Sequence, residues 1–145
     1  MGLDMYLNKR VFVGAAYDHR EVSGVIDIMQ GSKQIPIEFS KVKYVVEEAG
    51  YWRKANQVHN WFVENVQGGE DDCREYYVSR EQLVRLKEVC EEALRTRNSG
   101  LIPPKSGFFF GSTEVDNYYW DDLERTVEIL SNLDPNADYF YHSSW

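Results

Sequence analysis

Hydrophobic and polar residues alternate along the first third of the chain, and this period of two predicts β-strands. Long strands are expected in 3–14 (LDMYLNKRVFVG) and 42–52 (VKYVVEEAGYW), with shorter ones in 22–29 and 35–39. QGSKQ, between the two short strands, has the composition of a turn. The pattern predicts three or four strands in an antiparallel sheet with one face exposed to water.

A helical period then replaces the alternation and predicts helices over 52–67, 79–97 and 115–132. The second helix has the clearest signals, since Ser79 and Gln82 form a capping box and apolar residues follow on one stripe. Gly68-Gly69 is expected to end the first helix, and Gly100 the second. YYV at 76–78 and DYFYHSSW at 138–145 are read as further strands.

The order of these elements predicts the fold class. Strands come first, helices follow and a strand closes the chain, which favours an α+β fold over a parallel α/β sheet. The 145 residues fit one domain, 1–145, in which an antiparallel sheet packs against about three helices.

The first predicted helix contains an unusual run, GYWRKANQVHNWF (50–62), and helical spacing separates it into two faces. One face is apolar and is expected in the core: Val58, Trp61, Phe62 and Val66. The other is polar and rich in amides: Arg53, Asn56, Asn60, Glu64 and Gln67.

This polar face is the first candidate binding site. In that interpretation Tyr51 or Trp52 stacks a base, Arg53 pairs a phosphate, and Asn56, His59 or Asn60 hydrogen-bonds polar edges of the ligand. A merely solvated helix face explains the same spacing. In that case His59 is a structural residue at the helix boundary, and the two aromatic residues pack at a strand-to-helix junction.

A second candidate is the loop LIPPKSGFFFGST (101–113), which leads into the last predicted helix. Helix N-termini attract anions, so Lys105, Ser112 and Thr113 could bind a phosphate while Phe109 faces outward as a stacking surface. The structural alternative is that the phenylalanines anchor the loop in the core. Glu114 and Asp116 favour it, because their carboxylates compete with an anion at the helix terminus.

Net charge is −8 and the sequence pI is about 4.9, so no basic face for direct nucleic-acid binding is expected. An acidic protein can instead complement a basic partner protein. Ten tyrosines suit either a binding surface or ordinary strands. They also permit a homo-oligomer, and the sequence leaves the oligomeric state open.

Sequence signatures of catalysis are missing. His19, His59 and His142 lie far apart, neither cysteine has a close cysteine partner, and there is no nucleophile elbow. We therefore expect no metal, no cofactor and no catalytic residue, and binding is favoured over enzyme activity. No apolar run approaches membrane-spanning length and no secretory signal is recognisable, so a cytoplasmic protein is expected.

Several segments resemble a group of small proteins from phages and bacterial mobile elements. They are MGLDMYL at the start, GYWRKANQVHNWFV, DDCREYYVSREQL and SGFFFGSTEVDNYYWDDLE. Together they make up a little over a third of the chain and are spread over most of its length. The resemblance implies a phage or prophage setting in a bacterial cytoplasm, where small acidic phage proteins often act as counter-defence factors; it implies no activity for particular residues.

The sequence therefore predicts a phage-type, non-catalytic binding protein that counters bacterial immunity by sequestering a nucleotide-derived signal. The alternative is an acidic, anti-CRISPR-like inhibitor that covers the nucleic-acid-binding surface of a host defence protein. An enzyme that acts on a nucleotide is a third interpretation.

Overall fold

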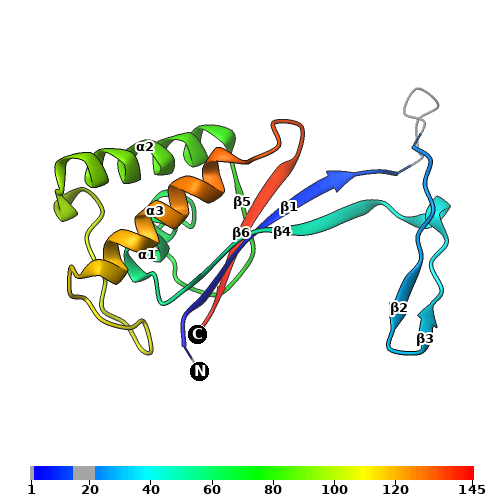
Figure 1. Cartoon of the computed structure of the whole chain (residues 1–145), viewed down its shortest axis with the longest axis horizontal. Coiled ribbons are helices and arrows are strands. Elements are labelled where there is room, and N and C mark those ends of the chain that lie inside the picture. The colour runs from blue at the N-terminus through cyan, green and yellow to red at the C-terminus, as the bar shows by residue number, and fades with distance from the viewer. Residues whose placement is uncertain (1, 15–21) are drawn as a thin grey trace.

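The computed structural model of the chain describes residues 2–14 and 22–145 and has an α+β fold (Figure 1). Four strands form an antiparallel sheet in the order β4-β1-β6-β5. Their bounds are β1 Asp4–Phe12, β4 Tyr44–Arg53, β5 Tyr76–Val78 and β6 Asp138–Ser144. The predicted fold class, an antiparallel sheet with three helices, is confirmed.

The helices are α1 (Asn56–Asn65), α2 (Arg80–Thr96) and α3 (Asn117–Ser131), and all three lie on one side of the four-stranded sheet (Figure 1). A short 3₁₀ helix, η2 (Ser99–Leu101), follows α2. The capping box of α2 is present as predicted. The Ser79 hydroxyl accepts a hydrogen bond from the Gln82 amide at 3.2 Å, and the Gln82 side-chain oxygen accepts one from the Ser79 amide at 2.9 Å.

The core lies between this sheet and the helices. On β1 and the residue before it, Leu3, Met5 and Leu7 are fully buried, as the period of two requires. Alternate β6 residues, Tyr139 and Tyr141, point the same way and are also buried. The helices complete this core with the stripes that their spacing predicted, including Phe62 on α1, Leu83, Leu86 and Cys90 on α2, and Tyr119, Leu123 and Leu130 on α3.

The prediction that a helix begins at Trp52 is wrong. Strand β4 continues through this region, with Trp52 paired to Met5 and Arg53 paired to Asp4. Lys54 then adopts a left-handed φ of 57°, and α1 starts at Asn56. Pairing with β1 therefore outweighs the helical spacing, and it removes Arg53 from the helix on which the polar stripe was built.

Strands β1 and β4 also continue outward beyond the sheet, where Val11 pairs with Val45 and Phe12 pairs with Tyr44 (Figure 1). Between them the chain forms a hairpin of β2 (Ile28–Gln30) and β3 (Lys33–Ile35) and a 3₁₀ helix, η1 (Phe39–Lys41). Gly31, in the two-residue turn of the hairpin, has a φ of 62°, which favours glycine. We call residues 22–46 the arm, and the remaining described residues the body.

Candidate functional site

The predicted polar stripe of α1 does not form one continuous surface. Asn56 and Gln67 are buried, Asn60 is half-buried and Glu64 is exposed, while Arg53 lies on β4. The tertiary packing therefore separates residues that the helical spacing had placed together.

Asn56 holds the loop that follows η2. Its side-chain nitrogen donates to the carbonyl oxygens of Phe110 (3.1 Å) and Ser112 (2.8 Å), and its side-chain oxygen accepts from the Lys105 amide (2.9 Å). The residue is almost fully buried, and three hydrogen bonds engage both ends of its amide. Asn56 therefore positions the loop, and its predicted contact with a ligand stays a prediction.

Trp52 is likewise a core residue, with 1% of its surface exposed. Its indole nitrogen donates to the Thr126 hydroxyl at 2.9 Å, which satisfies its polar atom inside the protein. A ring buried in this way has no free face for a base, so the prediction that Trp52 stacks a base is wrong. Tyr51 points to the opposite face of the sheet, where its hydroxyl donates to the Asp4 carboxylate at 2.5 Å and its ring packs beside Tyr6.

His59 belongs to a buried network that joins α1 to the C-terminal strand and to the loop before β5. Its Nδ1 lies 2.7 Å from the Tyr141 hydroxyl, and its Nε2 lies 2.9 Å from an Asp71 carboxylate oxygen. The other Asp71 oxygen accepts from the Trp145 indole at 3.1 Å. Both ring nitrogens are thus engaged.

Burial lowers the pKa of His59, and the neighbouring Asp71 carboxylate opposes that shift only in part. A neutral ring then donates from Nε2 to Asp71 and accepts at Nδ1 from Tyr141. This arrangement supports a structural role, because neither nitrogen is left to exchange a proton with a bound molecule.

Residues 105–111 (KSGFFFG), which we call the phenylalanine loop, place their three aromatic rings differently. Phe110 is buried and packs edge-on against His59, with ring centroids 5.2 Å apart. Phe108 is 75% exposed, and Phe109 is exposed beside it with ring centroids 4.2 Å apart. Only one of the three phenylalanines therefore anchors the loop in the core.

The backbone conformation of this loop explains why position 107 is a glycine and how Phe109 is held in place. A Cβ atom on Gly107 would lie 2.4 Å from the Phe110 ring, so only glycine fits beneath the buried phenylalanine. Phe109 has a left-handed φ of 62°, which is unfavourable for a bulky residue, and its carbonyl oxygen accepts a hydrogen bond from the Leu3 amide at 3.2 Å. The loop is thus held in one shape from several sides.

Beside the phenylalanine loop lies a cavity of about 350 Å³, which we call the loop cavity. It brings together three of the predicted site residues, His59, Asn60 and Lys105, although His59 is engaged by Asp71 and Tyr141. Two aromatic side chains with exposed surface, Phe108 and Trp145, also line it. The remaining lining residues are Val63, Glu64, Gly69, Asp71, Ser106, Gly107 and Phe110.

Other predicted residues lie at a second cavity, of about 280 Å³, which we call the acidic cavity. Arg53, Asn56 and Ser112 line it, but so do three carboxylates, of Glu114, Asp116 and Asp122. Burial raises the pKa of Asp122 to about 6, and the Gln57 side chain, at 3.3 Å, opposes that shift. The three carboxylates of the acidic cavity therefore disfavour the binding of a phosphate there.

The predicted anion site at the start of α3 is also disfavoured. Asp116 caps the helix by accepting from the Tyr119 amide at 3.1 Å, so a carboxylate already occupies the terminus. The Ser112 hydroxyl accepts from the Glu114 amide, and Thr113 is exposed outside both cavities. Ser112 and Thr113 thus do not join Lys105 in one site.

Sequence reasoning missed Trp145 and selected Phe109 where Phe108 lines the loop cavity. Trp145 directly follows β6, and no local spacing connects it with α1. Its position depends on β6 lying between β1 and β5, which brings it near the carboxylate of Asp71. Alternation in the run of phenylalanines would have grouped Phe108 with Phe110, whereas Phe108 is exposed and Phe110 is buried.

The loop before β5 is less acidic in effect than its sequence indicates. Asp71 contacts His59 and Trp145, while Asp72 contacts Arg74 and accepts from the Tyr76 hydroxyl at 2.8 Å. Glu70 lies 3.3 Å from Arg74. These carboxylates stabilise the loop, so they are less available to a basic partner than the alternative interpretation requires.

Residues 2–14 and 22–145 contain no group of three or more His, Cys, Asp or Glu side chains placed to hold a metal ion. His19 lies outside the described residues. None of the helices that these described segments form has the length and apolar character needed to cross a bilayer.

Comparison of the chain with protein-family models, with curated proteins and with solved structures gave no match. The resemblance to phage proteins therefore stays a prediction. The geometry of the site is therefore the structural basis for the function proposed below.

Proposed function

We propose that this protein is a non-catalytic binding protein that sequesters a nucleotide-derived molecule in the loop cavity. In the phage setting that the sequence resemblance implies, the molecule would be an immune signal in the cytoplasm of the bacterial host. The observation that supports this function most directly is that Phe108, Trp145, Lys105 and Asn60 line one cavity.

Each of these side chains suits a different part of a nucleotide. Phe108 is 75% exposed and Trp145 46% exposed, so both offer surface to a flat base, and stacking on an aromatic side chain contributes about 1–3 kcal/mol per base. Lys105 supplies a positive charge for a phosphate. The amide of Asn60 can both donate and accept a hydrogen bond at a base or sugar edge.

The size and charge of the cavity set limits on the ligand. Its volume of about 350 Å³ falls at the lower end of the range for small-molecule sites. Glu64 and Asp71 line the same cavity and would repel a phosphate beside them, which assigns the phosphate to the Lys105 side. A ligand with one base in the cavity and a phosphate near its rim fits these limits.

Retention of an intact ligand is the direct test. The purified protein would be incubated with cyclic dinucleotides and with cyclic ADP-ribose derivatives, separated from free compound, denatured by heat, and the supernatant analysed by mass spectrometry. We expect at least one compound to be released unchanged. Release of a converted product would show an enzyme, and retention of none would refute sequestration.

Variants of the lining residues test whether the retained compound binds in the loop cavity. Phe108→Ala should weaken binding of the retained compound by about 5- to 150-fold, the range expected for loss of one stacking partner. Tyr118→Ala is the matched control, because Tyr118 is an equally exposed aromatic residue that lines the acidic cavity instead. Equal losses in both variants would contradict the assignment of the site.

A protein inhibitor remains the competing function. It predicts that a large host protein copurifies with this chain in a salt-sensitive complex, and that changes at Glu70 and Asp72 weaken it more than Phe108→Ala does. That result would support the protein-inhibitor function and refute sequestration of a small molecule.

A further inference from the structure

The arm exposes a large share of its apolar side chains. Val25 is 95% exposed and Met29 is 54% exposed. The full set of large exposed apolar residues in the arm is Val22, Val25, Ile28, Met29, Ile35, Ile37, Tyr44, Val45 and Val46. An isolated two-stranded hairpin is marginally stable in water, and exposed apolar strands favour association. The arm thus has the properties of a surface that another molecule covers.

Both faces of the arm are open. Tyr44, Val45 and Val46 are consecutive on β4, so their side chains point to alternate faces of the ribbon, and all three are exposed. In the body, the same strand buries Trp52. None of the described segments packs as a layer on either face of the arm (Figure 1).

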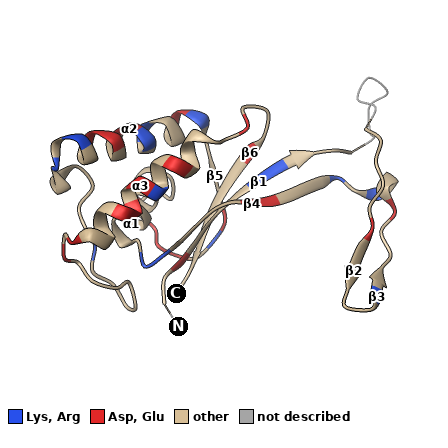
Figure 2. Ribbon diagram, in the orientation of Figure 1, with Lys and Arg blue, Asp and Glu red and all other residues tan. Residues whose placement is uncertain are grey.

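The charge of the arm differs in sign from that of the whole chain. The arm has three lysines, Lys33, Lys41 and Lys43, and two acidic residues, Asp27 and Glu38, whereas the chain has a net charge of −8. Figure 2 shows charged residues of both signs along α2 and acidic residues prominent on α3. Two arms therefore repel each other, whereas an arm and the body of another copy attract.

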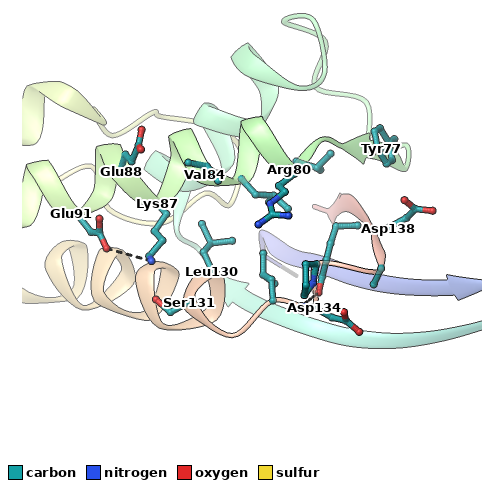
Figure 3. A pocket seen from close by; sticks show the side chains of 16 residues that line it. Tyr77, Arg80, Val84, Lys87, Glu88, Glu91, Leu130, Ser131, Asp134 and Asp138 are labelled. Atoms are coloured by element: carbon teal, nitrogen blue, oxygen red, sulfur yellow. Dashed lines mark hydrogen bonds and ion pairs between the residues drawn. The ribbon is translucent and has the colours of Figure 1, made fainter.

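The body has a groove that suits such an arm. A cavity of about 620 Å³ lies between α2, α3 and residues 133–139 (Figure 3). Apolar side chains line it: Val78, Leu83, Val84, Leu130, Leu133 and Ala137. Charged side chains of both signs surround them: the carboxylates of Glu88, Glu91, Asp134 and Asp138, and the cations of Arg80 and Lys87, of which Lys87 pairs with Glu91 at 3.7 Å.

The groove opens beside the point where the arm leaves the body. Two of its lining residues, Asp138 and Tyr139, pair with Arg10 and Lys9 of β1, and the next β1 residue, Val11, pairs only with β4. Two copies related by a two-fold axis can therefore place each arm at the groove of the other copy, and the exchange is reciprocal.

We propose that the arm docks in the groove between α2 and α3 of a second copy of this chain and so forms a two-fold dimer. Ile28 and Ile35 are cross-strand partners on one face of the hairpin, and this face covers the apolar floor of the groove. Lys33, and Lys41 with its partner Glu38 at 3.0 Å, then approach the Glu88 and Asp138 carboxylates. This proposal does not depend on the ligand of the loop cavity.

Sedimentation velocity over a range of protein concentrations tests the oligomeric state. The wild-type chain should form a dimer, and the double variant Ile28→Glu with Ile35→Glu should raise its dissociation constant about a hundredfold or more, since burial of one aliphatic side chain is worth about a factor of ten or more. Val84→Glu, on the groove, should act in the same direction. Leu101→Glu changes an exposed apolar residue of η2, outside the groove lining, and should leave the dimer unchanged.

Circular dichroism would show that the variants remain folded, which is expected because the changed side chains are exposed. A wild-type chain that stays monomeric across the concentration series would overturn the proposal. So would a dimer that the Ile28 and Ile35 changes leave intact.

Disulfide trapping identifies the contact itself. In a Cys73→Ser background, where the remaining Cys90 is buried, one chain would carry Ile35→Cys and a differently tagged chain Val84→Cys. Mixing the two should give a disulfide between unlike chains. Cross-links only between two Ile35→Cys chains would show arm-to-arm pairing and refute docking in the groove.

Discussion

The body and the arm share strand β4, yet they differ in what the side chains of that strand contact. In the body, β1 and β4 bury Met5, Leu7 and Trp52 beneath the helices. In the arm, β4 leaves Tyr44 and Val45 exposed although both residues are still paired with β1. Backbone hydrogen bonds therefore suffice to continue the ribbon, but only a second layer turns it into a core.

The difference also separates two kinds of exposed apolar residue. Scattered apolar residues on a surface are normal and need no partner. The arm instead collects them on both faces of one thin element, where no core is possible within a single chain. Because of this contrast we assign the dimer contact to the arm and not to another apolar surface.

The largest expected effect comes from the core of the body. Phe62→Ala should lower the free energy of unfolding by about 3–5 kcal/mol, because Phe62 is fully buried and its ring stacks on Tyr141 at 3.8 Å between centroids. Val45→Ala in the arm should change it by about 0.5 kcal/mol or less. Urea unfolding at concentrations where the chain is monomeric measures both. Similar losses would mean that the arm has a core of its own.

A smaller effect is expected at a buried polar residue. Asn56→Ala removes three hydrogen bonds to the phenylalanine loop and leaves their partners unpaired, which should cost about 2 kcal/mol or more. Gln34→Ala is the arm control, since its exposed side chain makes a 3.3 Å contact with Asp27. The midpoint of urea unfolding distinguishes them. If Asn56→Ala left the midpoint of unfolding unchanged, the three hydrogen bonds of Asn56 would not be needed to hold the phenylalanine loop.

The smallest effect concerns pH. Burial raises the pKa of Asp122 to about 6, above the unfolded value of 3.8, so its contribution to stability is fully present below 3.8 and is lost as the pH rises through about 6. Asp122→Asn should abolish this loss and, at neutral pH, stabilise the body by roughly 1 kcal/mol, an amount reduced by the remaining hydration of the carboxyl group.

Thermal unfolding between pH 4 and 7.5 would measure the Asp122 effect. Asp27→Asn in the exposed arm removes the same charge without changing burial and serves as the control. An identical pH profile for wild type and Asp122→Asn would refute the assignment of this titration to Asp122.

Local patterns predicted much of the fold. The period of two located β1 and β4, and the apolar stripe and capping box located α2, because these signals involve residues close in sequence. The site was predicted less well. Arg53 and Asn56 share a helical spacing but lie on different elements, and strand pairing with β1 decided where α1 begins.

The sequence by itself determined the fold class, the strands and helices, and most of the side chains that enter the core, since each follows from the period of apolar residues along the chain. Tertiary structure alone decided which polar residues remain available. It buried Asn56 and His59 in hydrogen-bond networks, and it brought Trp145 and Phe108 to one cavity from distant segments. The physical reason is that local spacing determines the direction in which a side chain points, whereas the packing of distant elements determines which groups it contacts.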